Sequence, residues 1–342
     1  MPISAGFLVW VGVAFVAAAC WGATVILNKE VLDDVAPVAV NFFVVAVSTA
    51  TLAAVAVPLS LLHLWPLGLG LTWRATGYLC ISAPVMWLVA FNAYFYALRS
   101  GRVGVVGPLS TTDPLFTALF ATVILGAALG RFVVAGLIVT VCGVMLISRW
   151  MDAEPGDGLL EAVVAPTGIG AGGGAPGRGA AAATAATAAA VTAGTGTVVG
   201  LSLLTAAGWG FSPVLVQLAE RSTGGATTTL VLLGEALGVA LLAPFVIAQR
   251  RRLFAAGSRD RRGRIALLLA GAGVLNAVFS VLYYVLIAEI GPVLTMLITA
   301  SAPVFAIAGG VLFLHERFGR RLALGVAVTL TGVLLATLQH VR

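Results

Sequence analysis

The chain has 342 residues, of which 60% are hydrophobic and only 9% are charged, and its mean hydropathy is +1.08. Charged residues make up about 25% of an ordinary soluble protein. The composition therefore excludes a soluble globular protein and indicates an integral membrane protein. The net charge of +6 rests on 18 arginines and one lysine, which are not interleaved with aromatic residues as in nucleic-acid-binding proteins. We expect a lipid bilayer as partner and no nucleic acid.

Charged residues and turn signals divide the chain into ten apolar segments. A helix of about 20 apolar residues crosses the hydrocarbon core, and its backbone must be hydrogen-bonded within the segment. The sequence therefore predicts an all-α integral membrane protein with ten transmembrane helices. Their approximate ranges are 7–28, 36–62, 75–98, 103–125, 131–149, 196–219, 226–249, 265–288, 291–314 and 321–340.

A segment rich in Gly, Ala, Thr and Pro separates the fifth span from the sixth. It has few large apolar side chains to bury, and such a composition is typical of flexible linkers. We therefore expect two five-helix units, at residues 1–149 and 196–342, joined by a flexible linker at 150–195.

The two units are internally similar. The sequence that starts at Tyr94 aligns without a gap on the sequence that starts at Tyr283, and Pro114 then falls on Pro303. Because each unit has an odd number of spans, the second unit must enter the membrane from the opposite side. The sequence therefore predicts two inverted five-helix repeats.

The same register places Gly136 and Gly143 on Gly325 and Gly332. Within each pair the glycines are seven residues apart, so they lie on one face of a helix. Glycines on one helix face allow the backbones of two helices to approach closely. We expect a packing seam at these positions.

Positive charges are distributed unequally between the two ends of the predicted bundle. One end receives 15 Lys and Arg residues and the other receives four. The seven arginines between the seventh and eighth spans contribute most, whereas the equivalent loop of the first unit has Arg74 alone. By the positive-inside rule the richer end is cytoplasmic, which would place both termini outside.

A tryptophan-glycine step begins each unit, at Trp21 and Trp209, and the fourth helices end near LGAALGRF and LHERFG. With its two five-helix units, the chain resembles the drug/metabolite transporter superfamily, in particular its EamA-type members. The resemblance implies a secondary transporter that exports or exchanges small metabolites by alternating access, with both termini in the cytoplasm. It also implies a central cavity, lined in this sequence around Trp21, Asn92, Asp113, Trp209, Tyr283 and Ser301.

Two acids lie deep within the predicted spans, Asp113 and Glu235. Charged residues at membrane depth are costly, and they usually face a cavity and serve proton or ion coupling. Both are therefore candidates for proton coupling. The alternative for Asp113 is a structural carboxyl that accepts hydrogen bonds from residues 110–112 before Pro114. The alternative for Glu235 is a single hydrogen bond between helices.

Aromatic and amide side chains form a second set of candidates. Trp87 and Tyr94 are seven residues apart and share a helix face, whereas Tyr94 and Tyr96 project to different faces. Asn92 lies one turn before Tyr96, so both are candidates for the cavity. Rings such as Trp21, Trp209 and Tyr283 select aromatic or aliphatic substrates or hold a cation. The alternative is helix packing and anchoring at the membrane interface.

No Arg or Lys falls in the interior of a predicted span, although some lie at span ends, so the phosphorylated substrates of some superfamily members are not expected. The sequence favours proton-coupled export of small neutral, zwitterionic or cationic molecules, such as amino acids or drug-like compounds. An uncoupled facilitator or channel is the alternative. An enzyme is disfavoured, since no metal-ligand or triad motif occurs, and we expect no cofactor and no metal. We expect a multi-pass protein of a bacterial inner (plasma) membrane, as a monomer or a homodimer.

Overall fold

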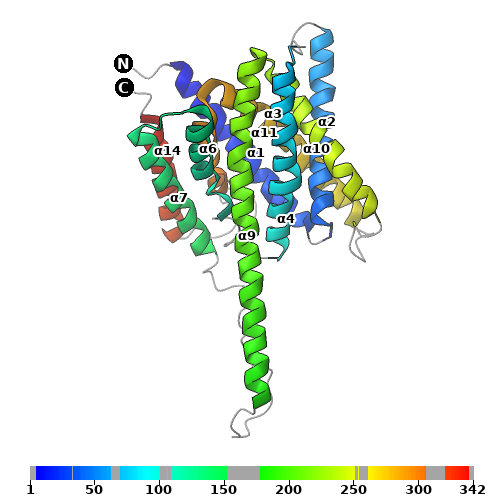
Figure 1. Ribbon diagram of the computed structural model, residues 1–342, viewed down its shortest axis with the longest axis vertical. Coiled ribbons are helices and arrows are strands. Elements are labelled where there is room, and N and C mark those ends of the chain that lie inside the picture. Colours follow the sequence, from blue (N-terminus) through cyan, green and yellow to red (C-terminus); the bar gives the residue numbers. More distant parts are fainter. Residues whose placement is uncertain are drawn as a thin grey trace.

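In the computed structural model, the described residues are 5–32, 34–62, 70–100, 106, 109–151, 178–250, 253, 261–305 and 320–338. They are almost entirely helical, and none of them forms a strand. The predicted all-α fold is confirmed (Figure 1). In chain order the helices are α1 (Ala5–Leu32), α2 (Pro37–Leu61), α3 (Trp73–Ala83), η1 (Pro84–Ala90), α4 (Phe91–Ser100), α6 (Asp113–Leu125), α7 (Arg131–Met151), α9 (Arg178–Thr223), α10 (Thr227–Ala248), α11 (Arg262–Ile290), α12 (Pro292–Thr299) and α14 (Arg320–Thr337).

Six of the predicted spans are helices long and apolar enough to cross a membrane. They are α1, α2, the continuous run α3–η1–α4, the part of α9 from Gly196, α10 and α11. The other four correspond, within the described residues, to shorter apolar helices at Asp113–Leu125, Arg131–Leu146, Pro292–Phe305 and Ala323–Thr337. The total of ten stays a prediction.

The segment expected as a linker is described only in its second part. Residues 152–177 lie outside the described residues, and α9 begins at Arg178, within the expected linker. In Figure 1, α9 continues beyond the other helices at one end of the bundle. The linker and the limits of the two units stay predictions.

The halves pack against each other in matching pairs, as inverted repeats require. Helix α1 packs on α11, and its counterpart α9 packs on α3, η1 and α4. Helix α6 packs on α9, and α12, which belongs to the equivalent span of the second half, packs on α1. The equivalent helices α2 and α10 contact each other, as do α7 and α14. The core of the bundle is therefore formed between the halves rather than within each of them.

The repeat register is visible in the hydrogen bonds of two helix breaks. A turn at residues 111–112 precedes Pro114, and a turn at residues 300–301 precedes Pro303. The Thr112 hydroxyl donates to the carbonyl of Leu109 at 2.7 Å, and the Ser301 hydroxyl donates to the carbonyl of residue 298 at 2.6 Å. Proline has no N–H to donate, so a helix readily begins around it.

Helices α7 and α14 meet at the predicted glycine seam. A Cβ atom added to Gly143 would collide with the backbone and side chain of Thr329, and one added to Gly332 would collide with Thr140. These contacts are equivalent in the repeat register. The prediction of a close-packed seam is confirmed at Gly136, Gly143 and Gly332.

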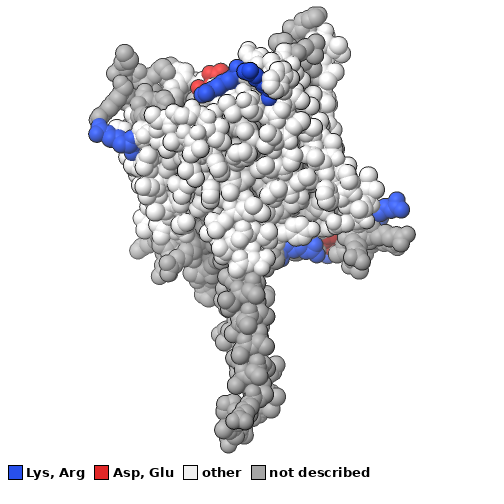
Figure 2. Space-filling model, in the orientation of Figure 1, with Lys and Arg blue, Asp and Glu red and all other residues white. Residues whose placement is uncertain are grey.

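The lateral surface is apolar. On the face shown in Figure 2, the Lys, Arg, Asp and Glu side chains gather at the two ends, and the belt between them carries none. Large apolar side chains such as Val123 and Leu267 are more than 70% exposed, at 72% and 73%. At one end, Arg261 and Arg264 form ion pairs with Asp34 and Glu30. This distribution suits a bundle surrounded by lipid.

Candidate functional site

A small cavity lies between the halves, among α3, η1, α4, α9, α10 and α11. Its volume is about 30 Å³. A water requires about 10–15 Å³ by this measure, so the cavity has room for about two waters and none for a metabolite. It is lined by Leu79, Ser82, Ala83, Met86, Trp87, Phe91, Ser212, Val216, Gly234, Glu235, Asn276, Phe279, Ser280, Tyr283 and Tyr284.

Glu235 is the acid that lines this cavity, and it is only 2% exposed. Its Oε1 accepts hydrogen bonds from the Ser280 hydroxyl at 2.5 Å and from the Asn276 amide at 3.3 Å. The same amide donates to the Ser48 hydroxyl at 3.1 Å. The second oxygen, Oε2, is buried without a hydrogen-bond partner among the described residues. One oxygen is thus held in place while the other is left free for a proton, a water or a substrate.

Helix geometry explains why these donors converge on Glu235. Asn276 and Ser280 are four residues apart on α11, so they lie one above the other on the face that packs against α10. Asn276 also reaches α2 through Ser48. Three helices from both halves are therefore tied to one carboxyl.

The π-helical segment η1 brings Trp87 to the wall of the cavity, against α10. The Trp87 indole N–H donates to the carbonyl of Gly234, at 3.2 Å, next to Glu235. A Cβ on Gly238, one turn further along α10, would lie 2.6 Å from the Trp87 ring. The ring therefore requires glycine there. Single π-helical turns occur frequently at functional sites.

Two serines also line the cavity. The hydroxyls of Ser82 on α3 and Ser212 on α9 lie 2.6 Å apart, in hydrogen-bond contact. They belong to different halves, like the helices that hold Glu235. The cavity is consequently a junction between the repeats, and relative motion of the halves would change its shape.

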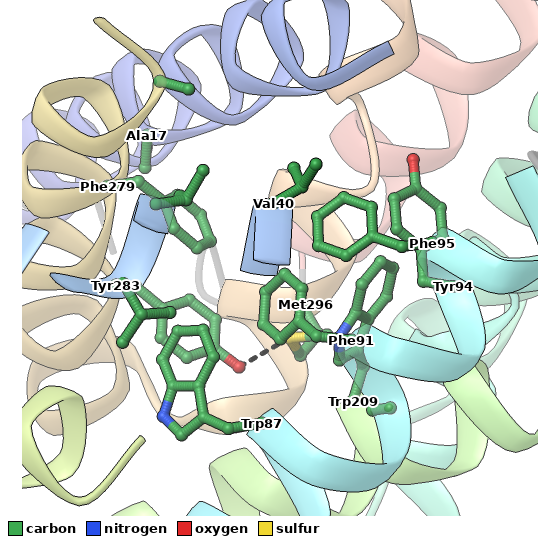
Figure 3. Packing of buried hydrophobic residues seen from close by; sticks show 14 of the residues in the cluster. Ala17, Val40, Trp87, Phe91, Tyr94, Phe95, Trp209, Phe279, Tyr283 and Met296 are labelled. Carbon is green, nitrogen blue, oxygen red and sulfur yellow. Dashed lines mark hydrogen bonds between the residues drawn. The ribbon is translucent and has the colours of Figure 1, made fainter. Parts of the chain in front are cut away.

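A layer of four aromatic rings, Trp21, Phe91, Trp209 and Phe279, borders the cavity; we call it the aromatic layer. The repeat-related rings of Trp21 and Trp209 meet edge to face with centroids 5.7 Å apart. Trp21 also contacts Phe91 and Phe279, at 5.7 and 5.3 Å. Figure 3 shows Phe91 beside Trp209 and Phe279 beside Tyr283.

Tyr283 joins the cavity to α12. Its hydroxyl donates to the sulfur of Met296 at 3.0 Å, the bond drawn in Figure 3. Tyr94, its counterpart in the first repeat, is buried against Trp209 with ring centroids 4.9 Å apart. Trp87 and Tyr94 are both buried in the same hydrophobic cluster. That they share a helix face stays a prediction, since the π-helical turn of η1 lies between them.

Asp113 is the first residue of α6 and is buried, but it does not line the cavity. Its Oδ1 has no hydrogen-bond partner among the described residues, and the same holds for the Ser110 hydroxyl. The Thr112 hydroxyl turns to Leu109 instead. The bonds expected from Ser110 and Thr112 in the structural alternative are therefore not formed to Oδ1. Asp113 also lies within electrostatic range of Tyr283, which does line the cavity.

Of the eight residues predicted for the site, the structure places Glu235 and Tyr283 at the cavity and Trp21 and Trp209 in the aromatic layer beside it. Asn92 is not at the cavity, because its amide donates to the carbonyls of Trp87 and Leu88, at 3.3 and 3.1 Å. Its Oδ1 accepts from Asn41.

Tyr96 and Ser301 are also away from the cavity. Tyr96 is 44% exposed on the outer face of α4, opposite the buried Tyr94. Ser301 is buried, and its hydroxyl is engaged at the helix break. In this conformation neither side chain lines the cavity, because one faces outward and the other bonds to the backbone. Their place at a substrate cavity stays a prediction.

Sequence reasoning missed three kinds of site residue. Ser280 has a signal, since it lies four residues after Asn276 and extends one polar stripe on α11. Ser82 and Ser212 are isolated hydroxyls in apolar helices and give no signal. Glu220 is buried as well, at 5% exposed, but it follows the predicted end of its span by one residue.

Comparison with known proteins agrees with this architecture. The profile of the EamA-like transporter family matches residues 8–149 and 183–338, which is most of the chain. The chain belongs to the EamA-like transporter family. No curated protein matches it. A solved structure described only as "Crystal structure of protein" has a TM-score of 0.65 at 16% identity, over 97% of this chain and 99% of that one. At that identity the likeness shows the fold alone.

Membership assigns the general activity. Proteins of the EamA-like family are membrane transporters, so this chain is a multi-pass membrane transporter of small substrates. The two matched ranges correspond to the two repeats. The cavity, which is built by both repeats, is the place in the described structure where a buried acid meets several polar donors.

Proposed function

We propose that this EamA-like protein is a proton-coupled secondary transporter that exports small neutral, zwitterionic or cationic metabolites by alternating access. Amino acids and drug-like cations are the substrate classes that we favour. Glu235 is the coupling carboxyl, and Asp113 is a second protonation site. The observation that carries the proposal is the position of Glu235 in the cavity between the repeats, with one oxygen fixed by donors and one without a partner.

A carboxyl in this position supports exchange of a proton for a substrate. A carboxyl in low-dielectric surroundings is stabilised either by binding a proton or by a nearby positive charge. A cationic or zwitterionic substrate that displaces the proton supplies the compensating positive charge. Proton and substrate then compete for one site, which is the simplest basis for coupled exchange.

The character of the cavity supports the proposed substrate class. None of the described residues that line it is an arginine or lysine, so no group there offers a charge-assisted bond to phosphate. Trp87, Phe91, Phe279 and Tyr283 present ring surfaces next to the acid. Ring faces attract cations by about 0.5–2 kcal/mol, more when water is excluded.

The small volume of the cavity supports alternating access. The described conformation is closed around Glu235, so a substrate enters only after the halves move. The breaks before Pro114 and Pro303 lie at equivalent positions, the first just before α6 begins and the second just after α12 ends. They are the natural places for bending, because the helical hydrogen bonds are already interrupted there.

The test is proton movement in liposomes that contain the purified protein under an imposed pH gradient. Labelled amino acids and quaternary cations are added in turn to wild type, Glu235→Gln and Asp113→Asn. The proposal expects at least one compound to trigger proton movement, and expects Glu235→Gln to abolish it. Gln keeps an acceptor oxygen for Ser280 and Asn276, so loss of coupling does not reflect loss of these bonds.

The alternative is an uncoupled facilitator for small metabolites. It predicts that labelled substrate crosses the wild-type membrane with no proton movement at all. Flux retained in Glu235→Gln but lost in Asp113→Asn would transfer the coupling role to Asp113. Unchanged coupling in both variants would contradict the proposal.

A further inference from the structure

Glu220, near the end of α9, is a third buried acid that the proposed coupling mechanism does not use. Its side chain is only 5% exposed. Its Oε2 accepts a hydrogen bond from the Thr227 hydroxyl at 3.0 Å, and its Oε1 is buried without a partner among the described residues. The unpartnered oxygen repeats the situation of Glu235, and a single bond to Thr227 does not account for it.

The position of Glu220 places it between the cavity and the end of the bundle. Ser212 and Val216 line the cavity on α9, and Glu220 follows Val216 by four residues, or about 6 Å along the helix. The exposed residues Arg221, Gly224 and Gly225 follow directly. Glu220 is therefore the last buried side chain on this face before water.

Tyr284 on α11 lies between the two glutamates. It lines the cavity with Glu235, and a Cβ added to Gly234 would lie 2.7 Å from its hydroxyl oxygen. Its ring packs into the cluster that contains Ala219, the neighbour of Glu220. The tyrosine is within electrostatic range of both carboxyls. Tyr78 packs into the same cluster, but of these two tyrosines Tyr284 is the one that also lines the cavity.

We propose that Glu220 is the residue that accepts protons from solvent at the start of a path that runs through Tyr284 to Glu235. This inference rests on the proposed coupling at Glu235. Water at the α9–α10 end protonates Glu220. The proton then leaves Glu220, the Tyr284 hydroxyl passes one proton on and regains one, and Glu235 ends protonated. Glu220 is left as a carboxylate, Tyr284 is unchanged, and any gap between these groups is bridged by water.

The charges around Glu220 allow this role. Tyr78 of α3 packs into the same cluster as Tyr284, and no described Lys or Arg forms an ion pair with Glu220. Arg221 and Arg74 are exposed at the same end. A carboxyl fixed by a salt bridge holds its charge, whereas Glu220 is held by a hydroxyl alone and is free to change its protonation state.

The opposing explanation is that Glu220 has a structural role only, in which its hydrogen bond with Thr227 holds α9 to α10. Two variants separate these roles. Glu220→Gln keeps an acceptor oxygen for Thr227 but has no titratable carboxyl proton. Thr227→Val removes the hydrogen bond but leaves the carboxyl in place. Tyr284→Phe removes the intermediate hydroxyl and leaves both acids in place. It is a second test of the proton path and replaces Glu220→Gln if that variant does not fold.

The experiment follows the protonated carboxyl of Glu235 by infrared spectroscopy of the full-length protein in lipid. Its band is assigned by its loss in Glu235→Gln, and the rate of its isotope shift is measured after transfer to D₂O. The path predicts that this exchange slows at least about tenfold in Glu220→Gln and in Tyr284→Phe. Thr227→Val is expected to exchange at the wild-type rate, and Glu220→Asp to recover part of it.

Each result decides one point. If the Glu235 carboxyl exchanged at the wild-type rate in Glu220→Gln, the proton path would be overturned. Slow exchange in Thr227→Val together with wild-type exchange in Tyr284→Phe would overturn it too. Either result would leave the proposed coupling at Glu235 intact. Absence of a protonated Glu235 band at any pH would overturn both proposals. Because the readout needs no substrate, it is independent of which compound the protein transports.

Discussion

Replacing Gly143 or Gly332 by alanine probes the contact between the two repeats most cleanly. A Cβ on Gly143 would lie 2.7 Å from the Cα of Thr329, which is 0.7 Å closer than the 3.4 Å at which ordinary contact begins. A Cβ on Gly332 would lie 2.8 Å from the carbonyl oxygen of Gly136. Both clashes involve backbone atoms, so α7 and α14 must move apart rather than rearrange a side chain.

The expected cost follows from two opposing effects. Overpacking a close contact costs about 1–3 kcal/mol, and replacing glycine by alanine within a helix recovers up to about 1 kcal/mol. We expect each variant to lose about 1–2 kcal/mol of unfolding free energy. Because the two contacts are equivalent, their costs are expected to be similar. The double variant is expected to cost less than the sum, since one separation of the helices relieves both clashes.

Unfolding of the purified protein in detergent, followed by denaturant titration, measures these differences. Gly200→Ala on α9 is the matched control, because a Cβ there meets nothing within 4 Å. It is expected to be as stable as wild type or slightly more stable. Wild-type stability in Gly143→Ala, or a cost confined to one of the two seam variants, would refute the close and symmetric packing of α7 on α14.

Three further predictions concern named bonds. Thr112→Ala and Ser301→Ala each remove one hydroxyl bond at a helix break, and each is expected to cost about 0.5–1.5 kcal/mol in the same titration. Glu235→Leu leaves two buried donors without an acceptor and is expected to be about 1–3 kcal/mol less stable than Glu235→Gln, whereas equal stability would contradict the hydrogen bonds described. Asp34→Asn breaks the 3.1 Å ion pair with Arg261, and is expected to cost less than about 1 kcal/mol and less still in high salt, as unfolding at two salt concentrations would show.

Much of the architecture follows from the repeat register. Aligning Pro114 with Pro303 predicts two equivalent interruptions, because proline lacks an N–H wherever it lies. The seven-residue spacing of Gly136 and Gly143 predicts the seam. The meeting of Trp21 with Trp209 is not predictable in this way, since the register equates two residues without saying whether they lie near the axis that relates the halves.

Side-chain direction in the third span does not follow from the sequence pattern. The π-helical segment η1, in which the Phe91 N–H bonds to the carbonyl of Met86, changes the helical register just before Asn92. The extra residue turns the following positions around the axis. The resemblance implies Asn92 at a cavity, and α-helical spacing adds Tyr96 one turn later, whereas the structure turns Asn92 to backbone carbonyls and Tyr96 outward.

The buried acids show a second limit. Glu235 is detectable because it lies in the middle of an apolar run, and the structure places it at the cavity. Glu220 lies near a span end, next to Arg221, where an acid is normally solvated. Glu220 is buried where α9 packs against α3 of the other repeat and against α10 and α11 of its own, and the local sequence does not show this packing.

The most direct measurement of the central claim is proton release on substrate binding to the detergent-solubilised protein, in weakly buffered solution with a pH indicator. The probe is whichever labelled amino acid or quaternary cation drives proton movement in liposomes. The account predicts release of about one proton per bound substrate in the wild type and none in Glu235→Gln. Equal proton release from Glu235→Gln and wild type would contradict the claim that substrate and proton compete at Glu235.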